Sequence, residues 1–214
     1  KLGGMEMDKV TGVVIAEALS YGGSGSFTVS ASTQTGIGML PIIWFGSEEQ
    51  QEKYLPKLAT GEVIGAYALT EPEAGSDATS GKTIANLSTD EKNYILNGEK
   101  LWCTNGTLAE IIVVMASNPE THKISTFVVE TAAEGVSVKH RCRFMGLRAL
   151  YNGVIRFRNA EVPASNVILA PGKGMRVALN ALSVGRLTLP AACAGLVDES
   201  LRITRDWCIE RRQW

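Results

Sequence analysis

The stretch between Glu62 and Pro171 constrains the fold of this chain most, because its hydrophobic pattern is that of strands. Short runs rich in Val, Ile, Thr and aromatic residues alternate there with Gly, Asn and Asp, which is typical of strands joined by turns. The spacing predicts a small antiparallel β-sandwich or barrel. The Asn97-Gly98 pair predicts a hairpin turn between two of the runs. The predicted strands are residues 63–69, 83–87, 94–96, 100–104, 111–116, 126–130, 136–140 and 154–157.

Helical patterns flank this stretch on both sides. From Met5 to Gly61 the apolar residues recur at helical spacing, with breaks predicted at Gly22-Gly23 and at residues 36–38. Ser47, followed three residues later by Gln50, predicts a capping box that opens a short helix. Beyond residue 171 the helical spacing returns and predicts a long helix. The chain therefore has an α+β pattern, and we expect domains at residues 1–61, 62–171 and 172–214.

Composition excludes several classes of function. The 214 residues carry a net charge of -1, so no overall basic surface is predicted for nucleic acid. No apolar run reaches the roughly 18 residues of a membrane span, so none is expected. Neither histidine, His122 or His140, has a partner at metal-ligand spacing, so we predict no metal site. The four cysteines form no C-x-x-C motif and are expected to be reduced thiols, namely Cys103, Cys142, Cys193 and Cys208.

The segment AYALTEPEAGSD, residues 66–77, is the first candidate site. Glu71-Pro72 is expected to end a strand, because the residue before proline is restricted and proline lacks an N–H donor. Gly75 and Ser76 then supply a glycine able to take positive φ and a hydroxyl, which suits close approach of backbone to a phosphate or thioester. An ordinary turn is the alternative, since the same residue types favour turns for local reasons.

The segment LWCTNG, residues 101–106, is the second candidate site. Trp102 and Thr104 lie two residues apart, so on a strand they are expected to face the same way. An indole beside a hydroxyl suits a flat heteroaromatic ring, with packing on the ring face and a hydrogen bond to a ring nitrogen. The alternative is that Trp102 is a core residue and Thr104 a neutral strand residue.

Taken in order, the motifs resemble those of the acyl-CoA dehydrogenase family of flavoproteins. TEPEAGSD is followed about 30 residues later by LNGEKLWCTNG, inside a strand-rich segment between helical ones. Further matches are FVVE at 127–130, RFMGLRALYNGVIRFRNAEVP at 143–163, PGKGM at 171–175 and ERRQW at 210–214. The resemblance covers essentially the whole chain. It implies the end of an N-terminal helical domain, a middle β domain, and the first long helix of a C-terminal helical bundle.

The resemblance implies FAD as cofactor and assigns residues to it. Residues bordering the isoalloxazine ring would be Tyr67, Leu69 and Thr70, and those near the FAD phosphates would be Gly75 and Ser76. Trp102 would cover the other side of the ring, with the Thr104 hydroxyl near N5. The C-terminal residues Arg211, Gln213 and Trp214 would reach the FAD of a neighbouring subunit. The last match implies a homo-oligomer, usually a dimer of dimers in this family. The alternative for these C-terminal residues is that they form a solvated helix end.

The implied reaction takes an α-proton and a β-hydride from an acyl-CoA and gives a trans-2-enoyl-CoA. The hydride would go to FAD N5 and the proton to a glutamate, which some relatives carry just before the arginine matched by Arg186. That position is Gly185 here, so no catalytic base is expected in this segment and the base is expected downstream. Arg186, Ser183 and Ser76 would lie on the substrate side, Arg186 as a supporting residue.

Partners and compartment follow from the same resemblance. An electron-transferring flavoprotein or a similar acceptor would take the electrons. The location would be cytoplasmic in a bacterium or the mitochondrial matrix in a eukaryote, and not secreted. The chain starts without methionine and ends within a helical pattern, so we expect a segment of a longer protein. Two alternatives stay open: an acyl-CoA or flavin binding subunit without a base, and a flavin monooxygenase of the same fold.

Overall fold

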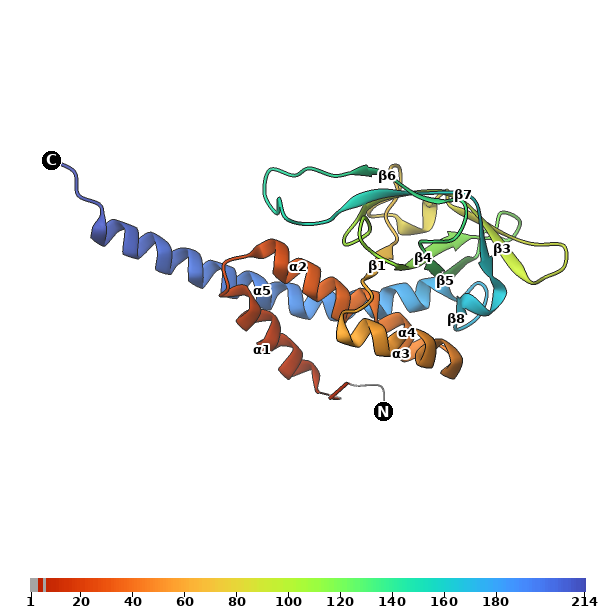
Figure 1. The fold of residues 1–214 in the computed structure, drawn as a ribbon, viewed down its shortest axis with the longest axis horizontal. Helices are drawn as coiled ribbons and strands as arrows, with labels where there is room; N and C mark the ends of the chain where they lie inside the picture. The colour runs from red at the N-terminus through yellow and green to blue at the C-terminus, as the bar shows by residue number, and fades with distance from the viewer. Residues whose placement is uncertain (1–3, 6) are drawn as a thin grey trace.

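The computed structural model describes residues 4–5 and 7–214 and has three parts, a group of helices, a β-sheet and a long helix (Figure 1). This arrangement confirms the α+β class and the order of its parts. The first residues of the expected domain 1–61 include 1–3 and 6, which lie outside the described residues. The helices that precede the sheet are α1 (Lys9–Ser20), α2 (Gly25–Thr33), a π-helix η1 (Gln34–Gly38), α3 (Leu40–Phe45) and α4 (Glu48–Thr60).

The predicted capping box opens α4. The Gln50 backbone N–H donates to Ser47 Oγ at 3.2 Å, and the Ser47 N–H donates to Gln50 Oε1 at 3.1 Å. Two backbone donors that the helix itself leaves unpaired are thereby satisfied. Gly61 ends the helix with φ of 74°, a left-handed conformation that glycine adopts without strain.

Replacing Ser47 by alanine is expected to lower the free energy of unfolding by about 1 kcal/mol, because an N-cap oxygen is lost. Urea unfolding of the two proteins measures the difference. Ser137→Ala is the control, since Ser137 is exposed on strand β6 (Val136–Arg141) and should change the free energy by less than about 0.5 kcal/mol. Equal effects of the two substitutions would contradict a capping role.

The break predicted at residues 36–38 lies between α2 and α3, where the chain forms the π-helix η1 and not a loop. Gln34 at its start donates to Leu58 O at 2.8 Å and to Val63 O at 2.9 Å, and it accepts from Gly65 N at 2.7 Å. One partly buried amide therefore ties the helices to the beginning of the sheet. A Cβ on Gly38 would lie 3.3 Å from the Gly65 carbonyl carbon, so glycine lets this turn approach the strand.

The strand-rich stretch forms one eight-stranded sheet in the order β6-β7-β3-β2-β4-β5-β8, with β1 also paired to β4. Most pairs are antiparallel as expected, but β1 and β2 each pair with β4 in parallel. The sheet is therefore mixed. Strand β6 lies at its edge. The remaining bounds are β1 (Gly65–Ala68), β2 (Ile84–Leu87), β3 (Asn93–Cys103), β4 (Ile111–Ser117), β5 (Ile124–Glu130), β7 (Gly153–Pro163) and β8 (Val167–Ile168).

The hairpin predicted at Asn97-Gly98 is wrong, because β3 runs through both residues. The turn that joins β2 to β3 lies at residues 88–92 instead, where Ser88 N donates to Asn93 O at 2.8 Å. Gly98 has φ of 150°, and a Cβ there would lie 2.5 Å from Thr83 Oγ1. Glycine is needed at this position for a close approach between segments, and the pairing of β3 with β7 shifts register beside it.

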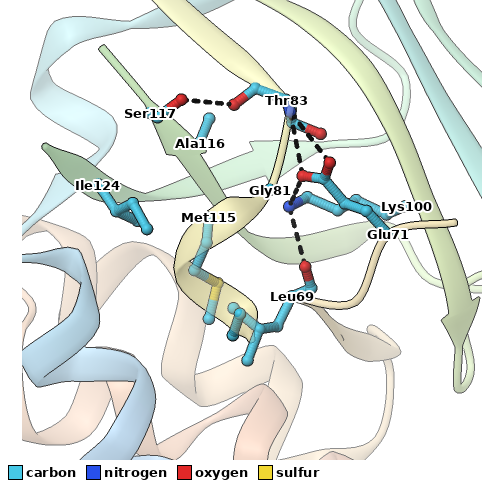
Figure 2. A pocket seen from close by; sticks show the side chains of 10 residues that line it. Leu69, Glu71, Gly81, Thr83, Lys100, Met115, Ala116, Ser117 and Ile124 are labelled. Atoms are coloured by element: carbon cyan, nitrogen blue, oxygen red, sulfur yellow. Dashed lines mark hydrogen bonds and ion pairs between the residues drawn. The ribbon is translucent and has the colours of Figure 1, made fainter. Parts of the chain in front are cut away.

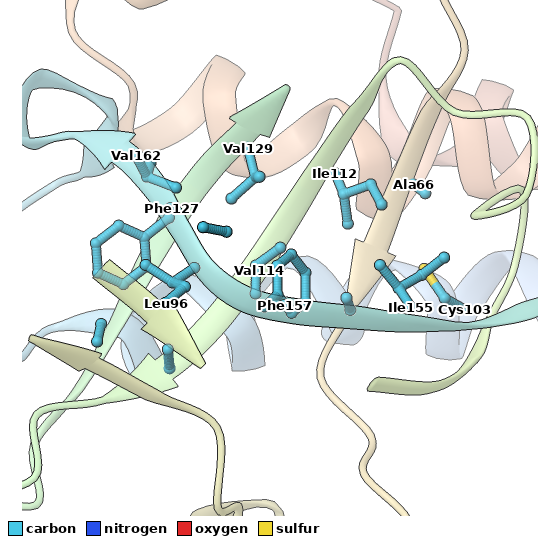
Figure 3. Packing of buried hydrophobic residues seen from close by; sticks show 14 of the residues in the cluster. Ala66, Leu96, Cys103, Ile112, Val114, Phe127, Val129, Ile155, Phe157 and Val162 are labelled. Carbon is cyan, nitrogen blue, oxygen red and sulfur yellow. The ribbon is translucent and has the colours of Figure 1, made fainter. Parts of the chain in front are cut away.

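Two apolar clusters hold the molecule together. The first lies within the sheet and includes Leu96, Phe127 and Phe157, all at most 2% exposed (Figure 3). The second lies between the sheet and the helices and includes Ile42, Val113 and other buried residues. The sheet is therefore covered by helices on one face, which fixes where the start of the last helix can sit.

The last helix, α5 (Gly174–Glu210), begins under the sheet and extends well beyond it (Figure 1). Its buried positions include Ala178, Ala181 and Gly195, and a Cβ on Gly195 would lie 2.5 Å from Glu17 O of α1. By length and composition alone α5 is apolar enough to cross a membrane, with a mean hydropathy of 1.3 over one window. Its N-terminal half packs against the sheet and the other helices in this structure.

Candidate functional site

The two sequence motifs lie side by side in the structure. Beyond β1 the chain continues to Thr70, whose carbonyl accepts a hydrogen bond of 2.8 Å from the Leu101 N–H at the end of β3. The Cys103 thiol is also 3.4 Å from the Tyr67 carbonyl oxygen. Residues 67–71 and 100–104 therefore form one surface, although about 30 residues separate them in the sequence.

A buried ion pair fixes the first motif to the second (Figure 2). Lys100 Nζ lies 2.7 Å from Glu71 Oε1 and donates to Leu69 O at 3.0 Å. The two charged side chains are only 2% and 6% exposed. Glu71 also accepts from the backbone N–H of Thr83 at 3.1 Å. The pair therefore ties the start of the loop to β3 and to the segment that leads into β2.

The pKa of Glu71 reflects two opposing effects. Burial raises the pKa of this carboxyl, but the Lys100 ammonium and the amide donors of Lys82 and Thr83 outweigh burial and hold it below its ordinary value. Burial lowers the pKa of Lys100, against the attraction of Glu71. Neither residue is among the predicted site residues, and the pairing of Glu71 with Lys100 was not predicted from the sequence. Lys100 lies an even number of residues along β3 from Tyr94 and Leu96, which are buried. This alternation is the sequence signal that could have indicated a buried Lys100.

The loop after Glu71 is tight at its start and open at its tip. Glu71 N donates to Ala74 O at 2.9 Å, and Ala74 N donates to Glu71 O at 3.2 Å. Asp77 accepts from Thr79 N at 3.2 Å and so caps the next turn. Gly75 and Ser76 between them are exposed. The turn alternative is thus correct for the two ends of the loop.

Gly75 does not take the positive φ that its type allows. A Cβ at this position would meet no atom of the described residues within 4 Å. Neither backbone conformation nor packing within this chain therefore requires glycine here. The free space leaves room for a ligand to approach the backbone of the loop.

Trp102 is not a core residue, because its side chain is 59% exposed. Its φ is 54°, which is uncommon for a bulky residue, and β3 shifts register against β7 between Lys100 and Cys103. The simple strand alternation used to place Trp102 and Thr104 on one face does not apply to such a backbone. Thr104, just beyond the strand, is partly buried.

A residue that the sequence analysis missed joins these two positions. The Asn152 amide donates to Trp102 O at 3.0 Å and to Thr104 Oγ1 at 3.1 Å. Asn152 directly precedes β7 and is 4% exposed. Its only sequence signal was its place in the RALYNG part of a matched motif, which indicates no partner.

Tyr67 and Leu69 have different environments. Tyr67 is 7% exposed, and its hydroxyl donates to Ala178 O of α5 at 3.4 Å. Burial raises the pKa of this hydroxyl above its ordinary range. The phenol thus packs against α5. Leu69 lines a small pocket beside Lys100, together with Met115 and Ile124 (Figure 2).

The structure does not bring the predicted residues of α5 together with the loop and β3. Ser183 is exposed, and its hydroxyl donates to Leu179 O at 2.8 Å. Arg186 is exposed and Gly185 partly buried. The C-terminal residues lie at the far end of α5 from the sheet (Figure 1), namely Arg211, Gln213 and Trp214.

A second cavity lies apart from the predicted site residues. A cavity of about 220 Å³ lies beside Tyr94, Lys123 and Gly172, and no predicted site residue lines it. Within residues 4–5 and 7–214, no group of three His, Cys, Asp or Glu side chains is placed to hold a metal ion.

Comparison with known proteins gives consistent matches. Residues 1–62 match the model of the acyl-CoA dehydrogenase N-terminal domain, and residues 66–160 match that of the middle domain. A probable acyl-CoA dehydrogenase of Bacillus subtilis is 41% identical over 99% of this chain and 35% of its own length. The human mitochondrial very long-chain specific acyl-CoA dehydrogenase is 39% identical over 87% of this chain and 30% of its own. The chain spans about a third of the length of these relatives.

A solved structure is similar over the whole chain. The acyl-CoA dehydrogenase of Bacillus anthracis, complexed with FAD, superposes with a TM-score of 0.94 and 39% identity. The similarity covers 100% of this chain and 37% of that one.

Proposed function

Since this chain belongs to the acyl-CoA dehydrogenase family, we propose that it forms the flavin-binding part of an enzyme that oxidises an acyl-CoA thioester to a trans-2-enoyl-CoA. One observation carries the proposal. The loop after β1 and the end of β3 form a single surface, joined by the Leu101 to Thr70 hydrogen bond of 2.8 Å and by the buried Glu71–Lys100 pair. The exposed Trp102 and the partly buried Thr104 lie at this junction, which leads into the open tip of the loop.

FAD is the cofactor in this proposal, and the residues present suit it. The Trp102 ring is exposed and able to pack on a flat ring, and the Thr104 hydroxyl donates no hydrogen bond within the described residues. The free space at Gly75 suits a phosphate close to the backbone. When bound, FAD would accept the hydride from the substrate.

Each remaining predicted residue has a role in the proposal. Leu69 and Thr70 border the ring, Tyr67 supports it from the α5 side, and Ser76 approaches both a phosphate and the acyl thioester. Ser183 and Arg186 lie toward the substrate. The residues beyond the end of α5, namely Arg211, Gln213 and Trp214, reach the flavin of a neighbouring subunit, and the part of α5 that extends beyond the sheet supports such a contact (Figure 1).

The acceptor of the α-proton is proposed to lie outside these 214 residues. A carboxylate must face the flavin across the substrate, and Gly185, which precedes Arg186, carries no side chain that could act as a base. We further propose domains at residues 1–61, 62–171 and 172–214. The helices through Thr60, the strands from Gly65 and the start of α5 at Gly174 support these boundaries.

The partners are proposed from the family. They are an acyl-CoA, further copies of this chain in a dimer of dimers, and an electron-transferring flavoprotein or a similar acceptor. The named relatives include bacterial and mitochondrial proteins, so the proposed location is the cytoplasm of a bacterium or the mitochondrial matrix.

The test uses the complete natural protein that contains this chain. We expect it to carry FAD with its absorbance near the usual flavin bands, and anaerobic addition of a saturated acyl-CoA series to bleach that absorbance with one chain-length class. Bound flavin that no acyl-CoA bleaches would contradict the dehydrogenase and favour the binding subunit. Two results together would favour the monooxygenase: bleaching of the flavin only by a reduced nicotinamide, and turnover that depends on oxygen.

A further inference from the structure

The orientation of the Asn152 amide is fixed by its neighbours. The Trp102 carbonyl can only accept a hydrogen bond, so the atom 3.0 Å from it must be the amide nitrogen of Asn152. The same nitrogen lies 3.1 Å from Thr104 Oγ1. The Thr104 hydroxyl therefore accepts this hydrogen bond and does not need to donate one to Asn152.

The proton of the Thr104 hydroxyl is consequently free. A hydroxyl has one proton and two lone pairs, and one lone pair is taken by Asn152. Within the part of the chain that the structure describes, Thr104 Oγ1 donates to no acceptor. A ring nitrogen or oxygen placed beside Thr104 would thus meet a hydroxyl whose proton is available to donate.

Asn152 also holds an unusual backbone. Trp102 has φ of 54°, and such a conformation in a bulky non-glycine residue is strained and persists only where surrounding contacts maintain it. The hydrogen bond from Asn152 to the Trp102 carbonyl is one such contact. The amide therefore controls both the exposed indole and the hydroxyl beside it.

The other end of the Asn152 amide has a different environment. Asn152 is 4% exposed, and its Oδ1 is buried without a hydrogen-bond partner among the described residues. A buried acceptor without a partner costs free energy, and the two hydrogen bonds donated by the amide nitrogen offset part of that cost.

We propose that Asn152 is a positioning residue for the flavin, which orients the Thr104 hydroxyl as a donor to the ring and holds the Trp102 turn against it. This inference rests on the proposed function. A donor beside the ring favours the electron-rich reduced form, so the effect of Asn152 on the flavin is transmitted through Thr104.

The experiment is a double-mutant cycle in the complete, FAD-loaded protein. Two substitutions are made, Asn152→Leu, which preserves volume, and Asn152→Ala. Each is introduced both into the natural protein and into the Thr104→Val variant. The midpoint potential of the bound FAD is then measured with redox dyes. Asn152→Leu is expected to weaken the preference for reduced over oxidised flavin about tenfold, a fall of about 30 mV for a two-electron couple. In the Thr104→Val background, Asn152→Leu is expected to change the midpoint potential of bound FAD little further.

The control is Asn166→Leu, which removes another buried amide, bonded to Val128 O at 2.9 Å, and is expected to leave the potential unchanged. The inference would be overturned if Asn152→Leu shifted the potential equally with and without the Thr104 hydroxyl. It would also be overturned if Thr104→Val changed the potential of bound FAD and neither Asn152 variant did. A natural protein that binds no FAD would overturn the proposed function itself, and the inference with it.

Discussion

Replacing Lys100 by methionine is expected to lower the free energy of unfolding by about 3 to 5 kcal/mol, because it leaves the Glu71 carboxylate buried without its counter-charge. The two side chains are 2% and 6% exposed, so water cannot compensate for the loss. Methionine keeps most of the lysine volume, so packing changes little. Urea unfolding of the FAD-free protein measures the effect.

Lys82→Met is the matched control for this prediction. Lys82 pairs with Glu73 on the same loop, but both side chains are exposed, at 74% and 69%, so we expect a loss of less than about 1 kcal/mol. Adding Glu71→Leu to Lys100→Met should recover much of the lost stability, since no buried charge then remains unpaired. Similar losses for Lys82→Met and Lys100→Met would show that the buried pair has no special role.

The three-part organisation could be predicted from the sequence because the spacing of apolar residues, which distinguishes helices from strands, can be read from short stretches of the chain. The helical spacing before residue 61 and the strand pattern after it do not depend on distant partners. The capping box is equally local, with Ser47 and Gln50 three residues apart. These predictions are confirmed by the structure.

The errors arise where a distant segment decides the local structure. Asn97-Gly98 has the composition of a hairpin turn, but the contact with Thr83 requires glycine within a continuous strand. Lys100 is buried because Glu71, 29 residues away, meets it. Asn152 contacts Thr104 across 48 residues. No window of local sequence contains such pairs, so only the family motifs indicated that these segments meet.

Trp102 combines high exposure with a restricted backbone, a combination that folding of this chain alone does not require. A free indole that is 59% exposed gains little from the contacts it makes within the chain. Its left-handed backbone turns the ring out of the strand, and Asn152 maintains that turn. The cost is understandable if the ring packs against a ligand.

Replacing Trp102 by alanine is therefore expected to weaken FAD binding about 10- to 100-fold, since a stacked aromatic contact and its buried area are lost. The unfolding free energy of the FAD-free protein should change by less than about 0.5 kcal/mol, because the ring is exposed. Fluorescence titration with FAD and urea unfolding measure the two quantities. Trp44→Ala is the control, since Trp44 is 41% exposed on α3 and should leave FAD affinity unchanged. Unchanged affinity in Trp102→Ala, or an equal loss in both variants, would remove Trp102 from the proposed flavin site.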